Sequence, residues 1–336
     1  MNSIKNILIK VIFFISIIYC QNEVCFDIEQ NPNSNNSAFS CFSKYVNVLD
    51  CFDIYAQSTI SDEKVLHVAS VVAELLDNNE DGVVDDPALE QILRQEGALM
   101  PIFTSDGNSC MNQFENYYNG DGVSAVLWRN EIDPNQPGHW GADATVEEVL
   151  HTINHVGHVQ LYPSIFNINP NSSLMSEAMD VARGGQFLTV PSSYPEEAWY
   201  HYDDWTCDYQ CMAIEYLYWC IVSHLGILDD VQTCNGIDNE WELCTPELFQ
   251  TIDISMYDIL INSEYLIPQL APDGNYCPAG SVSGDVNLDS VVNILDVILT
   301  VNIILGIDEF NGQADLNADN TVDILDVVSI LNIILS

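Results

Sequence analysis

The spacing of apolar residues predicts a chain built mainly of helices. In residues 61–76 apolar side chains recur every three or four positions, the spacing of one helix face, and Ser61 precedes them as the expected N-cap. The same spacing predicts further helices from Pro87 onward, over 145–158, over 176–187 and in the second half of 200–219.

Two short apolar runs, at 98–104 and 124–128, have the length and composition of β-strands. Both precede the helix predicted at 145–158. The pattern therefore predicts an α+β fold that is mainly helical, with strands ahead of the helix that carries most of the histidines.

The C-terminal residues 284–336 contain one pattern twice. GDVNLDSVVNILDVILTVNIIL is followed by ADLNADNTVDILDVVSILNIIL, and both copies have the spacing of oxygen ligands that a calcium loop requires at its positions 1, 3, 5, 7, 9 and 12. The predicted ligands are Asp285, Asn287, Asp289, Val291, Asn293 and Asp296 for one ion, and Asp315, Asn317, Asp319, Thr321, Asp323 and Asp326 for the other. Each loop leads into an apolar helix, at 297–305 and 327–335. Neither helix can bury its apolar face alone, so we expect the two to pack together.

This segment resembles a type I dockerin, which has two loop–helix calcium repeats with Asp at position 12. The resemblance covers about the last sixth of the chain and implies calcium-dependent folding and docking to a cohesin-like protein. Ser290 and Asn320 depart from it, because glycine is usual at these loop positions. The apolar pairs at 294–295 and 324–325 replace polar recognition residues, which leaves an intramolecular clamp or assembly on a surface as alternatives.

Composition restricts the partners of the chain. Its 336 residues include 50 acidic residues and only seven Lys and Arg, giving a formal net charge of −43. Such a charge repels nucleic acid and anionic membranes, so we expect neither nucleic-acid binding nor membrane insertion. It fits the binding of multivalent cations, or a saline habitat in which an acidic surface keeps the protein soluble.

The N-terminal residues 1–20 have the pattern of a secretory signal peptide, with Lys5 and Lys10 before an apolar run too short to cross a membrane. We therefore expect a secreted, extracellular protein. Of the eleven cysteines, ten remain after Cys20, which predicts up to five disulfide bonds. We expect Cys207 and Cys211 each to pair with a distant cysteine. The predicted organisation is a signal peptide at 1–20, a polar lead at 21–40, the main domain at 41–270, a linker at 271–283 and the calcium module at 284–336.

Residues 145–158, TVEEVLHTINHVGH, carry the main candidate for catalysis. Thr145 is the expected N-cap, with Glu148 closing a capping box. His151, His155 and His158 are spaced to share one helix face, and two histidines at i and i+4 can bind one zinc ion, as in HExxH metallopeptidases. Thr152 stands where the HExxH glutamate would be, so Glu148 or another carboxylate would have to act as the general base.

A further zinc ligand is expected from outside this helix. Glu215 is the first candidate, because an unpaired carboxylate on so apolar a helix is costly to bury. Glu177 is the second, because its distance downstream resembles that of the third ligand in gluzincin metallopeptidases. This weak resemblance implies a zincin-like fold for the main domain. Tyr209 or Tyr216 could stabilise a developing oxyanion.

The stretch DNNEDGVVDDP is a half-formed calcium loop. Asp77, Asn79, Asp81 and Asp85 occupy positions 1, 3, 5 and 9, but position 12 is Ala88. The sequence predicts a weak calcium site here, with a solvated turn between two helices as the alternative.

Three functions fit these patterns, and the substrate stays unknown in each. The first is a zinc-dependent, peptidase-like hydrolase attached to the dockerin-like module, with calcium and zinc as cofactors. The second is a non-catalytic secreted or surface calcium-binding interaction protein. The third is a glycoside hydrolase carrying a dockerin, although no pair of carboxylates stands out in the sequence.

Overall fold

The computed structural model describes residues 26–276, 278, 284, 286–287, 292–307, 314, 316 and 321–335. The predicted signal peptide lies outside these residues. So do six predicted calcium ligands, which are Asp285, Asp289, Val291, Asp315, Asn317 and Asp319.

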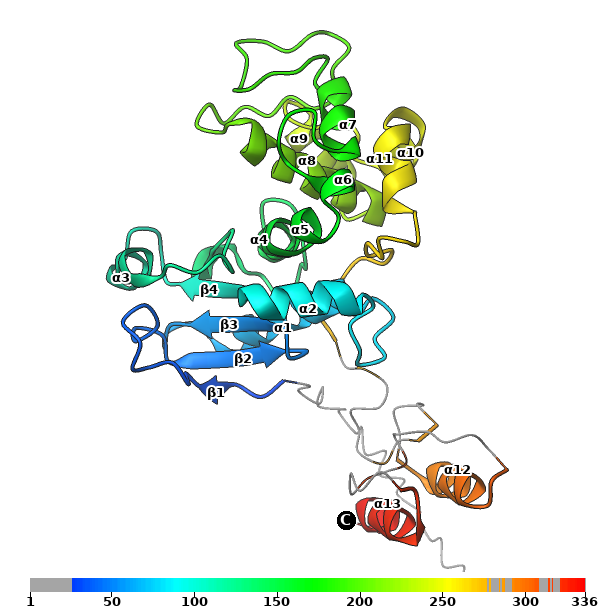
Figure 1. Ribbon diagram of the computed structural model, residues 1–336. Helices are drawn as coiled ribbons and strands as arrows, with labels where there is room; N and C mark the ends of the chain where they lie inside the picture. The colour runs from blue at the N-terminus through cyan, green and yellow to red at the C-terminus, as the bar shows by residue number, and fades with distance from the viewer. Residues whose placement is uncertain are drawn as a thin grey trace, which may run out of the picture.

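A five-stranded sheet forms the N-terminal half of the main domain, in the order β1-β2-β3-β4-β5 (Figure 1). β1 pairs antiparallel with β2 and β2 with β3, while β3, β4 and β5 run parallel. The strands are β1 (Glu29–Gln30), β2 (Lys44–Val48), β3 (Phe52–Ala56), β4 (Leu99–Phe103) and β5 (Leu127–Trp128). The sequence pattern predicted β4 and β5 but missed the first three strands.

Alternating side chains give the sheet two buried faces. Ile54 and Met100 face the main core together with helix α1, whereas Tyr55 and Leu99 face a smaller aromatic cluster on the other side. α1 (Asp62–Leu76) and α2 (Pro87–Glu96) connect β3 to β4, and α3 (Ser109–Tyr117) connects β4 to β5. The first two helices begin where the sequence predicts, after Ser61 and at Pro87.

Helices form the rest of the main domain, and α4 lies between the sheet half and the other helices (Figure 1). These elements are η1 (Arg129–Glu131), α4 (Thr145–Thr152), η2 (Ile153–His158), α5 (Val159–Leu161), α6 (Pro163–Phe166), α7 (Leu174–Ala182), α8 (Tyr209–Leu225), α9 (Val231–Ile237), α10 (Pro246–Ile252) and α11 (Ile254–Leu260). The structure is thus a mixed α/β fold, as predicted in outline. No helix among the described residues combines the length and apolar character needed to cross a membrane.

The histidine-bearing helix differs from its prediction in two ways. Ala144 is the N-cap and no side chain caps the helix; the Thr145 hydroxyl instead donates to Asp143 at 2.6 Å, so the predicted capping box is wrong. After Thr152 the helix widens into the π-helical turn η2. Because a π-turn has more residues per turn, it changes which residues share a face, and the predicted common face of the three histidines is lost.

Three disulfide bonds lie among the described cysteines. They join Cys41 to Cys110, Cys207 to Cys211 and Cys234 to Cys244. The prediction of distant partners for Cys207 and Cys211 was wrong. Cys207 lies before α8, which starts at Tyr209, so its backbone is not helical and its side chain can reach Cys211. Disulfides of this number are typical of extracellular proteins.

The predicted weak calcium loop after α1 is closed by hydrogen bonds. Asp77 is fully buried, and its carboxylate accepts from the backbone N–H groups of Asp81 and Gly82 and from the Tyr276 hydroxyl. Asp85 accepts from the backbone of Asn78. Asp77 therefore holds the loop to the chain segment that follows the main domain, and calcium binding by Asp77, Asn79, Asp81 and Asp85 stays a prediction.

Glu74 is expected to make the protein less stable at alkaline pH. Its buried carboxylate accepts from the backbone N–H groups of Gly274 and Asn275, and burial raises its pKa to about 8 from an ordinary 4.5. Because the folded state then binds more protons than the unfolded state, the stabilisation is complete below pH 4.5 and is lost as the pH rises toward 8. The loss is at most about 1.4 kcal/mol per pH unit.

Denaturant titrations at pH 5, 6.5 and 8 test this expectation. Glu74→Gln should flatten the dependence of the unfolding free energy on pH, whereas Glu63→Gln, an exposed change on the same helix, should leave it unchanged. An equal slope in Glu74→Gln and the parent protein would contradict the assignment.

The C-terminal module contains two helices that pack together, α12 (Ile294–Ile304) and α13 (Ile324–Leu335) (Figure 1). A small core joins them and includes Val297, Val327 and Ile330. The predicted pairing of the two apolar helices is confirmed.

Candidate metal centre and calcium module

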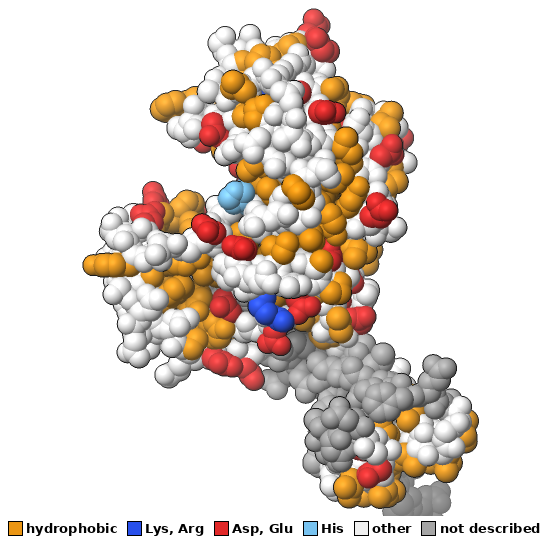
Figure 2. All heavy atoms as spheres, in the orientation of Figure 1, with side chains coloured by type: hydrophobic (Ala, Val, Ile, Leu, Met, Phe, Trp, Pro, Cys, Tyr) orange, Lys and Arg blue, Asp and Glu red, His pale blue; other side chains and the backbone are white. Residues whose placement is uncertain are grey.

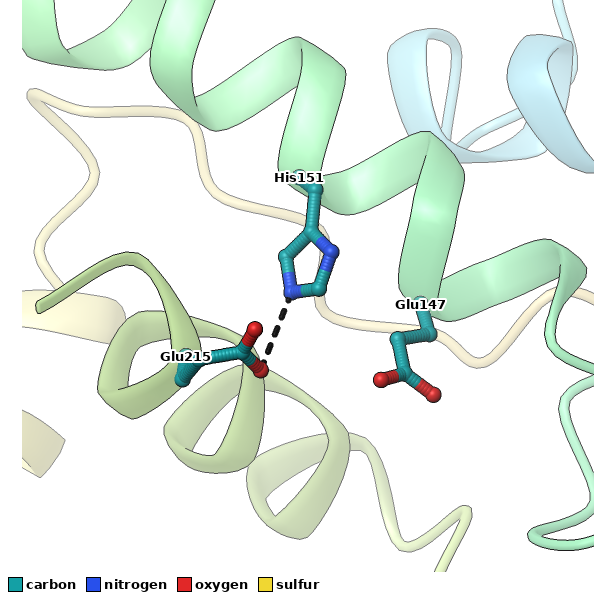
Figure 3. A group of neighbouring side chains, drawn as sticks. All are labelled: Glu147, His151 and Glu215. Carbon is teal, nitrogen blue, oxygen red and sulfur yellow. Dashed lines mark ion pairs between the residues drawn. The ribbon is translucent and has the colours of Figure 1, made fainter. Parts of the chain in front are cut away.

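Three side chains from two helices converge in the main domain (Figure 3). Glu147 and His151 lie one turn apart on α4, so they project from the same face of that helix. Glu215 comes from α8, where most neighbouring side chains are buried. One nitrogen or oxygen atom from each of the three residues lies within 4.8 Å of those of the other two. The three are therefore close enough to bind one metal ion.

His151 has the orientation expected of a metal ligand. Its side chain is only 10 % exposed, and Nδ1 lies 3.4 Å from Oε2 of Glu148. Nε2 lies 3.3 Å from Oε2 of Glu215, yet this contact has no hydrogen-bond geometry and Nε2 has no hydrogen-bond partner. A buried polar atom without a partner is costly. This nitrogen faces Glu215, with which it forms an ion pair, and Glu147 lies nearby (Figure 3).

The electrostatics of the cluster favour a cation. Burial alone lowers the pKa of His151, but the negative charges of Glu215 and Glu148 outweigh it and hold this pKa well above its ordinary value. Burial raises the pKa of Glu147 to about 8, and burial together with Asp203 raises that of Glu240 to about 7. Burial is the main cause of both shifts, and among the described residues no Lys or Arg forms an ion pair with Glu147, Glu215 or Glu240.

Two tyrosines border the cluster. The ring of Tyr218 packs edge-on against His151, with 5.6 Å between ring centroids. Burial, together with the negative charge of Glu215, raises the pKa of Tyr202. The predicted oxyanion donors lie elsewhere, since Tyr209 donates to Asp180 and Tyr216 donates to Asp253. Tyr202 was missed because it precedes the helix in a segment without periodic pattern.

His155 and His158 have different surroundings. His155 lines a pocket of about 290 Å³ together with His151 and Glu215, and burial lowers its pKa. Ser124 on one side and Cys211 on the other place this pocket between the sheet half and the helical half. Figure 2 shows the molecule hollowed between these halves, with a histidine side chain on the floor of the hollow.

His158 is not among the residues that line this pocket. Its Nδ1 pairs with Asn154 at 2.9 Å, its ring packs against Phe166, and burial lowers its pKa to about 4. Glu177 also lies apart, in a groove between α7 and α11. The structure thus brings together Glu215, His151 and the base candidate Glu148, but neither His158 nor Glu177.

Glu147 is the ligand candidate that the sequence prediction missed. Glu147, Glu148 and His151 have the spacing of the first three key residues of HExxH, with Glu in place of the first histidine. The predicted motif has His151 at the position of the first histidine of HExxH. With His151 at the position of the second histidine, Glu147 takes the position of the first ligand.

The two repeats of the calcium module have equivalent hydrogen bonds among their described residues. Asp296 accepts from the backbone N–H groups of Val286 and Asn293, and Asp326 accepts in the same way from those of Leu316 and Asp323. Both aspartates are fully buried. Each stands at position 12 of its loop, where a calcium loop places a carboxylate ligand, and its hydrogen bonds tie the loop to the first turn of the helix.

Comparison with known proteins identifies only this module. Residues 283–335 match the family model of the dockerin type I domain. No curated protein and no solved structure matches the chain. The zincin-like resemblance therefore stays a prediction. The C-terminal segment of this chain is a type I dockerin, a domain whose family binds calcium and docks to cohesins.

Proposed function

We propose that the chain is a secreted zinc-dependent hydrolase of peptide bonds, which its dockerin attaches to a cohesin-like partner. The observation that carries the proposal is the convergence of Glu147, His151 and Glu215 around a buried nitrogen that has no hydrogen-bond partner. The pocket beside them gives a substrate access to this point.

The three side chains suit zinc chemically. Imidazole nitrogen and carboxylate oxygen are both common zinc ligands, and two carboxylates balance the charge of one divalent ion. A bound zinc ion supplies Lewis-acid polarisation of a substrate carbonyl. Catalytic zinc sites have three protein ligands, and this is the number found here.

Glu148 supports one of the ligands. It faces Nδ1 of His151, the ring nitrogen opposite the metal position, so we assign it to orient the imidazole rather than to activate water. This contact fixes the direction of the ring before the metal binds. Burial and the charge of Glu215 act together on Tyr202 and raise its pKa.

A second candidate is a glycoside hydrolase, favoured by one distance. The nearest oxygens of Glu147 and Glu215 lie within 4.8 Å, and the two carboxyl groups of retaining glycosidases are about 5–5.5 Å apart. Such an enzyme would need no metal, so the two candidates differ in their response to chelation.

Hydrolysis of a fluorogenic peptide library and of soluble polysaccharides tests the proposal. We expect peptide hydrolysis that requires zinc and that falls about 10–100-fold in Glu148→Gln, the usual effect of removing a partner behind a metal ligand. Glu177→Gln, a matched change outside the cluster, should retain full activity. Chelator-resistant hydrolysis of a polysaccharide would favour the glycosidase, and no hydrolysis of either substrate would leave a non-catalytic binding protein.

A further inference from the structure

A second pocket adjoins the metal cluster and shares Glu147 with it. This pocket has a volume of about 250 Å³ and lies beside the first turn of α4. Its side-chain walls include Asn130, Glu131, Trp140 and Tyr218, and the chain from Gly141 to Ala144 completes it. A substrate side chain bound there would lie next to a peptide bond held at the metal position.

Trp140 forms an aromatic wall of this pocket. The indole is seated against Gly236, where an added Cβ would lie only 2.5 Å from a ring carbon. The glycine thus permits a close approach of backbone and ring. Trp140 remains 39 % exposed, and part of its surface faces the pocket. Tyr218 supplies a second, buried aromatic ring.

Carboxylates give the pocket its charge. Glu131 and Glu147 both line it. Asp143 also lines it but is fully engaged, since it accepts from Gly138 and Thr145 and pairs with His67. None of the described residues that line the pocket is a Lys or Arg. A cation entering it would gain from the carboxylates and from the electron-rich ring faces together.

We propose that this pocket binds a Lys or Arg side chain of the peptide substrate. The inference rests on the proposed function and specifies its substrate. The aliphatic part of the side chain packs against Trp140 and Tyr218, and the cationic end pairs with Glu131. An anionic side chain is repelled, and a neutral one of the same shape gains only the aromatic contact.

Isothermal titration of the full-length, zinc-free protein in calcium buffer tests the proposal without turnover. The probes are N-acetyl-arginine amide and N-acetyl-citrulline amide, which have nearly the same shape but differ in charge. We expect the arginine compound to bind at least about tenfold more tightly, as expected for one charged hydrogen-bonded pair. Glu131→Gln should remove this preference, because glutamine can still accept the Trp128 N–H bond that Glu131 accepts. Glu177→Gln should keep it.

Three results would overturn the inference. Equal binding of the two compounds is one, an unchanged preference in Glu131→Gln is another, and binding of a neutral monosaccharide in place of both is the third. The titration needs neither zinc nor hydrolysis, so the two proposals can fail separately. Arginine binding without any hydrolytic activity would support the pocket proposal and contradict the proposed hydrolase. Zinc-dependent hydrolysis without a preference for the arginine compound would support the hydrolase and contradict the pocket proposal.

Discussion

Replacing His151 by alanine is expected to lower zinc affinity by more than about 100-fold. Even the loss of a partner behind a ligand typically costs about 10–100-fold, and His151 supplies the only nitrogen of the cluster. The two remaining carboxylates would repel each other without an intervening ring. Competition with a chromophoric zinc chelator measures the affinity at constant pH.

His155→Ala distinguishes two ligand sets: Glu147, His151 and Glu215, which converge in the structure, and the pair His151 and His155, which the sequence predicts. His155 lines the same pocket, but it is not one of the three converging residues. We expect its removal to change zinc affinity by less than about threefold. A large loss in His155→Ala with little change in Glu147→Gln would place the metal on the two histidines and contradict the assigned ligand set.

Removing calcium is expected to unfold the dockerin while the main domain remains folded. The core between α12 and α13 is small, with Val286, Val297, Ala314, Val327 and Ile330 as its buried residues, and a core of this size rarely supports a fold alone. Binding energy of the metal is then folding energy. We expect Asp296→Ala and Asp326→Ala each to weaken calcium binding and to lower the helix content of the module.

Tryptophan fluorescence distinguishes the two parts of the chain. All six tryptophans lie between Trp128 and Trp241, and residues 284–336 contain none. Chelation should therefore reduce far-ultraviolet circular dichroism and expose the C-terminal segment to protease without shifting the tryptophan emission. A shift of that emission at the same calcium concentration would show that the two parts unfold together.

The sequence predicted best what is encoded locally. The spacing of Asp296 and Asp326 within their loops defines both calcium repeats, since all ligands come from a few consecutive residues. Glu215 was found because a carboxylate on an apolar helix needs a partner. The starts of α1 and α2 followed from cap and proline signals.

Features that depend on tertiary structure could not be predicted in this way. The π-turn after Thr152, which separates His158 from His151, has no signature in the apolar pattern. The pairing of β2 with β3 depends on a chain reversal that the sequence pattern did not indicate. Glu147 was missed for a different reason. It occupies the position of the first histidine of HExxH, so a search for that motif with histidine at this position does not find it.

The zinc and calcium content of the secreted protein, purified without chelators and measured by plasma mass spectrometry, tests the central claim most directly. The structure predicts about one zinc ion per chain in the parent protein and none in His151→Ala, with calcium unchanged between the two. Calcium without zinc or another transition metal in the parent protein would contradict the metal centre and leave a calcium-dependent binding protein.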